Sequence, residues 1–142
     1  MRDTIAPNID AIRTTLAAAD LPFADFVRMF LPRFAEVAGR VPVGSVAKVV
    51  IGESRNFPEL AKVWHDEVAS KAIGAIAAFI ERAQERGEVR DGDPRLYAFS
   101  LMGPMVLGAL WRTTLVPAGG TPLDLTALAK QHSEMVLAGL LK

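Results

Sequence analysis

The chain has 142 residues, 51% of them hydrophobic and 23% charged, which suits one domain with a sizeable core. Its 16 basic and 16 acidic residues give zero net charge, which excludes a general attraction to nucleic acid or to anionic membranes. The absence of cysteine excludes disulfides and thiolate sites. It also fits a reducing cytoplasm, and because the N-terminus lacks the apolar core of a signal peptide, we expect a cytoplasmic protein.

Apolar residues at helical spacing predict the first two helices. The first should end near residue 20, and its apolar face holds Ile5, Ile9, Ile12 and Leu16. The second should run from Pro22 to Gly39 with a face of phenylalanines, and Pro32 should kink or interrupt it. The following run, SVAKVVIGES, is rich in the strand formers Val and Ile, but it shows no alternation and no partner strand. We therefore predict a short buried helix there.

The remaining chain predicts three further helices, which makes about six in an all-α bundle. The longest should begin after Asn56-Phe57-Pro58 and run toward Gly87, a suitable left-handed terminator, before the loop ERGEVRDGD. Asp93 should cap the next helix, which extends to about residue 115. A loop rich in Pro and Gly then precedes a final helix that begins near Asp124.

The last two helices are unusually apolar. The 16 residues LYAFSLMGPMVLGALW carry no charge, but they fall short of the roughly 20 that a membrane span needs. We therefore expect no membrane partner and predict a homodimer in which these helices pair with a second copy as a four-helix bundle. The alternative is that both helices are buried within one monomer. The predicted interface comprises Leu101, Met105, Gly108, Ala109, Arg112, Leu125, Leu128, His132, Met135, Val136 and Gly139.

Few residues could support catalysis. His65, in the tetrapeptide WHDE, should be solvated, and no His–carboxylate pair should form there because adjacent residues on a helix point to different faces. Glu53 should be a partly buried carboxylate that pairs with Arg55 or a helix end, with an acid catalyst as the weaker alternative. His132 should hydrogen-bond to the partner copy across the interface. We expect no catalytic residues, no metal and no cofactor, so an enzyme is the least favoured class.

Several segments occur in an order that resembles a known family. These are VVIGESRNFPELAKVWHDEV, then ERGEVR, then DPRLYAFSLMGPMVLG and a closing amphipathic helix. Between about Pro22 and Leu141 the chain resembles the C-terminal effector-binding and dimerisation domain of TetR/AcrR-family transcriptional regulators. The most specific features are Glu53, the run from Phe57 to Leu60, and Gly87-Glu88 before an Asp-Pro helix start.

The resemblance implies a single domain, residues 1–142, that senses a small hydrophobic effector and dimerises within a repressor-type regulator. The aromatic and methionine residues, which composition alone assigns to core or pocket, would then line the effector site: Phe26, Met29, Phe30, Phe34, Val50, Trp64, Met102 and Met105. No helix-turn-helix pattern precedes Ile5, so we expect the DNA-binding domain to be absent and DNA contact to require a missing N-terminal domain. The alternative is a stand-alone lipid- or isoprenoid-binding protein, similar to the TetR-fold accessory protein of ubiquinone biosynthesis.

Overall fold

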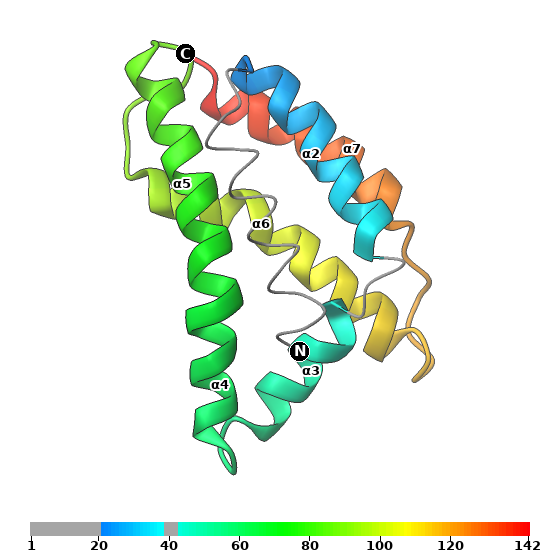
Figure 1. Cartoon of the computed structure of the whole chain (residues 1–142). Coiled ribbons are helices and arrows are strands. Elements are labelled where there is room, and N and C mark those ends of the chain that lie inside the picture. The colour runs from blue at the N-terminus through cyan, green and yellow to red at the C-terminus, as the bar shows by residue number, and fades with distance from the viewer. Residues whose placement is uncertain (1–20, 39–42) are drawn as a thin grey trace.

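The computed structural model describes residues 21–38 and 43–142, and this part of the chain forms a helical bundle, as predicted (Figure 1). The helix predicted before residue 20 lies outside the described residues. The helices are α2 (Phe23–Ala38), α3 (Val43–Glu53), α4 (Pro58–Trp64), α5 (Ser70–Glu85), α6 (Pro94–Leu110) and α7 (Leu125–Leu140), with two π-helical segments, η1 (His65–Ala69) and η2 (Trp111–Leu115).

The predicted helix boundaries agree closely with those observed. α4, η1 and α5 follow one another directly and form the predicted long helix, which Gly87 terminates with a φ of +80°. α6 begins with Asp93 as its N-cap, whose carboxylate accepts a 2.9 Å hydrogen bond from the Arg95 backbone N–H. Pro32 lies inside α2 without interrupting it. A proline in a helix removes one backbone bond, and the packing of α2 on its neighbours outweighs that loss.

The run SVAKVVIGES is helical, as predicted, but it is not a buried helix. Among residues 48–53, only Val50 is buried, while Val49 and Ile51 are exposed. α3 packs against α4, α6 and η2. The prediction of burial was wrong because the Val and Ile content shows only how apolar a helix is. It does not show how many sides of that helix are covered by neighbouring helices.

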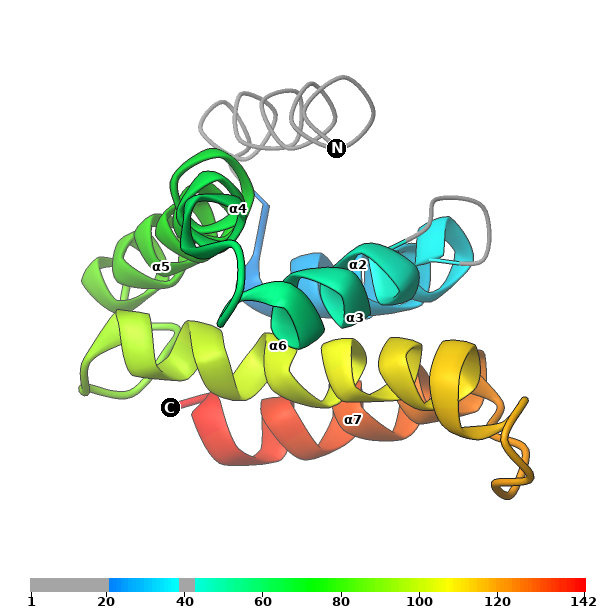
Figure 2. The ribbon, with the colours of Figure 1, turned by 90° about the horizontal axis from the view of Figure 1, so that it is seen from below.

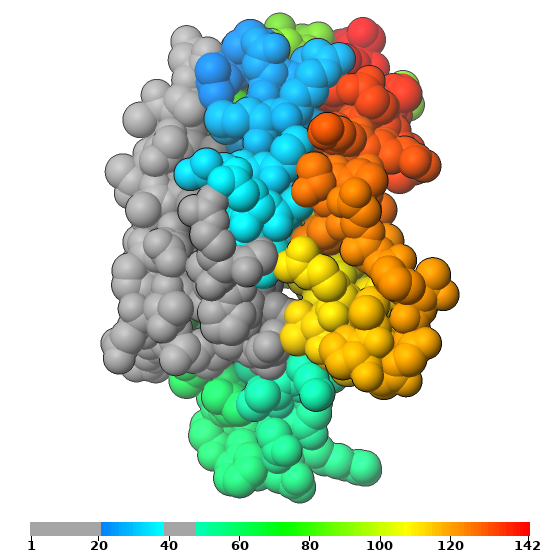
Figure 3. Space-filling view, turned by 90° about the vertical axis from the view of Figure 1, so that its right-hand side faces the viewer, coloured from blue at the N-terminus to red at the C-terminus, as the bar shows by residue number. Residues whose placement is uncertain are grey.

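Helices α2, α5, α6 and α7 pack around a common core. α2 and α7 pack side by side, which the ribbon and the space-filling view both show, and α6 packs against both of them and against α5 (Figures 1 and 3). At the centre of the core, the Phe26 ring lies 4.2 Å from the Phe79 ring, centroid to centroid. Burial of one such side chain stabilises the fold by about 1.5–3 kcal/mol. The core lies at the end of the molecule where α5 and α6 cross (Figure 1).

The chain end is fastened to the loop between α5 and α6. The Arg90 N–H donates to the Leu140 carbonyl at 2.9 Å, and the Lys142 N–H donates to the Glu88 carbonyl at 3.0 Å. The Tyr97 hydroxyl of α6 donates to the Asp91 carbonyl of this loop at 2.7 Å. These bonds fix the start of α6 relative to α7. No helix within the described ranges is long and apolar enough to cross a membrane.

Candidate functional site

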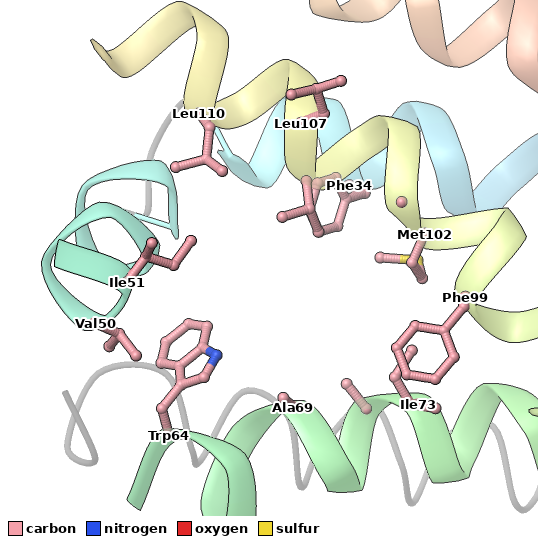
Figure 4. Close-up of a pocket in the computed structure, with 13 residues that line it drawn as sticks. Phe34, Val50, Ile51, Trp64, Ala69, Ile73, Phe99, Met102, Leu107 and Leu110 are labelled. Atoms are coloured by element: carbon pink, nitrogen blue, oxygen red, sulfur yellow. The ribbon is translucent and has the colours of Figure 1, made fainter. Parts of the chain in front are cut away.

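An apolar cavity lies where the helices diverge from the core. The long helix α4–η1–α5 and helix α6 separate toward one end of the molecule, and α3 bridges the gap between them (Figure 1). The cavity has a volume of about 510 Å³ and is lined from five helices and one π segment (Figure 4). Its lining comprises Phe34, Val50, Ile51, Trp64, Ala69, Ala72, Ile73, Phe99, Met102, Gly103, Val106, Leu107 and Leu110.

The sequence provides both the walls and the space of this cavity. Large side chains form the walls, whereas the small residues Ala69, Ala72 and Gly103 leave room between the long helix and α6. The π segment η1 lies directly after Trp64 and includes Ala69, so the helix is locally widened where it borders the cavity. π-helical turns are rare and occur often at functional sites. The cavity therefore depends on a local backbone feature as well as on side-chain size.

The lining is almost entirely hydrocarbon. Among the described lining residues the only side-chain nitrogen or oxygen atom is Trp64 Nε1, and Met102 contributes a weakly polar sulfur. None of these thirteen residues carries a charge. Sites of this volume and composition suit small, largely apolar molecules, whereas an ion would lose its hydration without a compensating partner.

Four of the eight predicted pocket residues line the cavity, namely Phe34, Val50, Trp64 and Met102. The other four lie elsewhere: Phe26 and Met105 are fully buried in the core, Phe30 packs against the core, and Met29 is 53% exposed. The phenylalanine face of α2 thus contributes mainly to the core, and only its C-terminal part reaches the cavity.

Most of the α6 wall was not predicted from the sequence. Phe99, Met102, Val106 and Leu110 recur at spacings of three and four residues, so they form a second apolar stripe on α6. The first stripe, which contains Leu101, faces the core. A helix that is apolar all round has to be covered on more than one side, and the second stripe could have been assigned to a cavity on that ground.

The predicted dimer interface divides into buried and accessible residues. Seven residues of the set are buried within their own chain: Leu101, Met105, Gly108, Ala109, Leu125, His132 and Val136. Arg112 and Leu128 are half-buried, while Met135 and Gly139 are exposed. The strongest apolar stripe of each helix therefore packs α6 against α7 inside one chain, and the sides accessible to a partner lie next to those stripes.

His132 makes its hydrogen bond within its own chain, not to a partner copy as expected. Its Nε2–H donates to the Leu101 carbonyl of α6 at 2.8 Å. The other ring nitrogen, Nδ1, has no hydrogen-bond partner within the described residues.

The candidate acid–base residues lie outside the cavity. His65 is exposed, as predicted, but its Nδ1–H donates to Asp66 Oδ1 at 2.9 Å, so the expectation that WHDE forms no His–carboxylate pair was wrong. The π segment changes the angular spacing of neighbouring side chains, and exposed side chains can bend toward each other. Asp66 also accepts a 2.6 Å bond from Lys62 Nζ. This bond, followed by the one from His65, lowers the pKa of Asp66 below its usual value, and it raises the pKa of Lys62.

No catalytic or metal centre emerges from the described residues. Glu53 is exposed at the end of α3 and not partly buried as expected. Within residues 21–38 and 43–142, no cluster of three His, Asp or Glu side chains could hold a metal ion. The apolar cavity is therefore the candidate functional site.

Comparison with known proteins agrees with this architecture. Residues 24–135 match the family described as the tetracyclin repressor-like C-terminal domain. The fold is similar to that of a Mesorhizobium loti protein assigned to the TetR family of transcriptional regulators, with a TM-score of 0.75 and 18% sequence identity. That similarity covers 96% of this chain and 68% of the M. loti chain. A comparison with curated proteins finds no match. Because the family match spans most of the sequence, the chain belongs to the family of tetracyclin repressor-like C-terminal domains.

Proposed function

We propose that this domain is the effector-binding and dimerisation part of a repressor-type TetR regulator and that the apolar cavity binds a small hydrophobic effector. The observation that carries the proposal is the cavity of about 510 Å³ with a hydrocarbon lining, since folded domains seldom leave so much apolar surface unfilled. An apolar ligand would remove this surface from water and stabilise the folded domain.

The location of the cavity supports a sensing role. Its walls come from helices that are close in space but distant in the sequence, including α3, the long helix and α6. A ligand that contacts all of them would favour the arrangement of helices that fits it best, because a ligand shifts a conformational equilibrium by its differential affinity. Leu107 of α6 lines the cavity and is also 61% exposed. Helix α6 would therefore contact the effector and also form part of the outer surface of the domain.

The accessible surface of α6 and α7 supports dimerisation. We define the α6–α7 face as Ser100, Pro104, Leu107, Gln131, Met135 and Gly139, which helical spacing places on adjacent sides of the two helices. None of these residues carries a charge. The charged residues Lys130 and Glu134 lie on the other side of α7, where Glu134 pairs with Arg28 of α2 at 3.6 Å. Figure 2 shows α6 and α7 running along each other at one side of the molecule.

The binding proposal is tested with a neutral apolar dye, N-phenyl-1-naphthylamine, whose fluorescence rises when it leaves water. We expect saturable binding to the wild-type domain. Ala72→Phe fills the cavity with an aromatic ring and should abolish this binding, whereas Ala78→Phe makes the same change at an exposed position of the same helix and should preserve it.

Thermal unfolding of both variants checks that each remains folded. Equal dye binding by wild type and by a folded Ala72→Phe variant would contradict the proposal, because the dye would then bind elsewhere on the protein. Absence of dye binding to the wild-type domain would also count against it.

A further inference from the structure

Trp64 gives the described lining of the cavity one directional polar group. It lies at the end of α4, and its indole Nε1–H is the only side-chain N–H or O–H donor among the described residues that line the cavity. Figure 4 shows the ring rising into the cavity, with its nitrogen on the side that faces the cavity interior. The described lining offers no carboxylate, amide or hydroxyl oxygen that could accept a hydrogen bond.

The second tryptophan of the chain, Trp111, has a hydrogen-bonded indole N–H and provides a comparison. Trp111 Nε1 donates to the Thr121 carbonyl at 2.8 Å, so its N–H is already used. Trp64 Nε1, by contrast, donates no hydrogen bond to any of the described residues. Indole N–H groups that leave water usually find a partner, because an unpaired buried donor lowers stability. Within the described part of the chain, no other acceptor therefore competes with a ligand for the Trp64 donor.

Charge sets a second limit on the ligand. An anion or a cation that enters the cavity would lose its hydration, and no oppositely charged side chain of the described lining could replace it. A purely hydrocarbon ligand would fill the space but would leave the Trp64 N–H without a partner. A neutral molecule with one acceptor oxygen satisfies both requirements.

We infer that the cavity selects a neutral, mostly hydrocarbon molecule with one hydrogen-bond acceptor, such as a ketone or ether, whose oxygen accepts from Trp64 Nε1. This inference rests on the proposed function and specifies the chemical class of its effector. It assigns Trp64 as the residue that orients the ligand, and it excludes free carboxylic acids and organic cations as effectors.

Three compounds with the same two-ring skeleton test the inference. Benzophenone has one acceptor oxygen, diphenylmethane has none, and 4-benzoylbenzoate adds a negative charge to benzophenone. Their affinities are measured by calorimetry for the wild type and for Trp64→Phe, which keeps an aromatic ring but removes the donor. Trp64→Phe should weaken benzophenone about five-fold more than it weakens diphenylmethane, the effect of one neutral hydrogen bond. The benzoate should bind the wild type at least about ten-fold more weakly than benzophenone.

Nitrogen-15 NMR supplies a readout that affinity alone does not give. Benzophenone should shift the Trp64 indole proton downfield, diphenylmethane should not, and the Trp111 indole should serve as an internal reference because its N–H is already bonded. If both neutral compounds bind but Trp64→Phe weakens them equally and the Trp64 proton does not shift downfield, the inference is overturned while the proposed function stands. Tighter binding of the benzoate also overturns it. If neither neutral compound binds the wild type, both the inference and the proposed function fail.

Discussion

His132 places a polar ring in the otherwise apolar contact between α6 and α7. Its bond to the Leu101 carbonyl joins the two helices, so removal of the donor should destabilise their packing. We expect His132→Leu to lower the free energy of unfolding by about 1–3 kcal/mol, the usual effect of losing a buried hydrogen bond. His132→Gln places an amide donor near the position of Nε2 and should retain part of that stability. Urea unfolding at a fixed protein concentration measures both, and equal losses in the two variants would argue against a role for the bond.

The pKa of Asp66 reports on the hydrogen bonds that this residue accepts on the exposed side of the long helix. Its pKa is lowered chiefly by the hydrogen bond from Lys62, so Lys62→Met should raise it toward the ordinary value of an aspartate. Because the folded pKa lies below the unfolded one, the carboxylate's contribution to stability is present above the unfolded pKa and disappears as the pH falls through the folded pKa.

Carbon-13 NMR of the Asp66 carboxyl group follows this titration directly. Lys71→Met serves as the matched control, since Lys71 pairs with Glu67 at 3.7 Å and not with Asp66. An Asp66 pKa that is identical in wild type and Lys62→Met would rule out the assigned cause.

At the scale of elements, the contact between α6 and α7 depends on a glycine. A Cβ atom at Gly108 would lie 2.6 Å from Leu125 Cδ1 and 2.8 Å from Leu128 Cδ2, and Leu125 is buried and cannot move freely. Overpacking of this kind costs about 1–3 kcal/mol, whereas the gain in helix propensity from Gly to Ala is about 1 kcal/mol. Gly74 of α5 is exposed, lies outside the α6–α7 face and has open space where a Cβ would lie. We therefore expect Gly108→Ala to be less stable than Gly74→Ala in thermal unfolding. The reverse order would contradict this packing of α6 on α7.

Helices were predictable from this sequence, but the division of their faces was not. The boundaries of α6 and α7 follow from local chemistry, because Asp93 and Asp124 cap them with their side chains. Which side of α6 faces the core, the cavity or the solvent depends on where α3, α5 and α7 lie. Since α6 is apolar on all sides, its sequence alone does not show which side is buried in the core, which lines the cavity and which is exposed to solvent. The core residues Phe26 and Met105 were for this reason predicted as pocket residues.

The π segments were also beyond local prediction. η1 interrupts a helix whose apolar periodicity continues on both sides, and η2 directly follows α6, so the sequence pattern predicts plain α-helix in both places. The wider turn shifts every residue after it around the helix axis. Trp64, which precedes η1, lines the cavity, whereas Ile76, which follows it, lies in the core.

At the scale of the whole molecule, α6 carries more exposed large apolar side chains than any other described helix, and α7 adds Met135. Met135 is 63% exposed in the isolated chain, beside the uncharged surface of α6. Thr126 lies nine residues earlier, which is about two and a half helical turns, so it projects from the opposite side of α7. It is exposed as well. The two positions therefore allow the same charge to be introduced on the proposed interface and away from it.

We expect Met135→Lys to convert a dimer into a monomer of 15.3 kDa, because a lysine at the centre of the α6–α7 face would have to lose its hydration without a partner. Thr126→Lys should remain dimeric. Sedimentation equilibrium measures the mass of both variants, and circular dichroism checks that the helices persist, since an exposed methionine contributes little to the core. A dimeric Met135→Lys variant would place the interface on another surface. A monomeric wild type at micromolar concentration would mean that α6 and α7 are covered sufficiently within one chain, which is the alternative that the sequence left open.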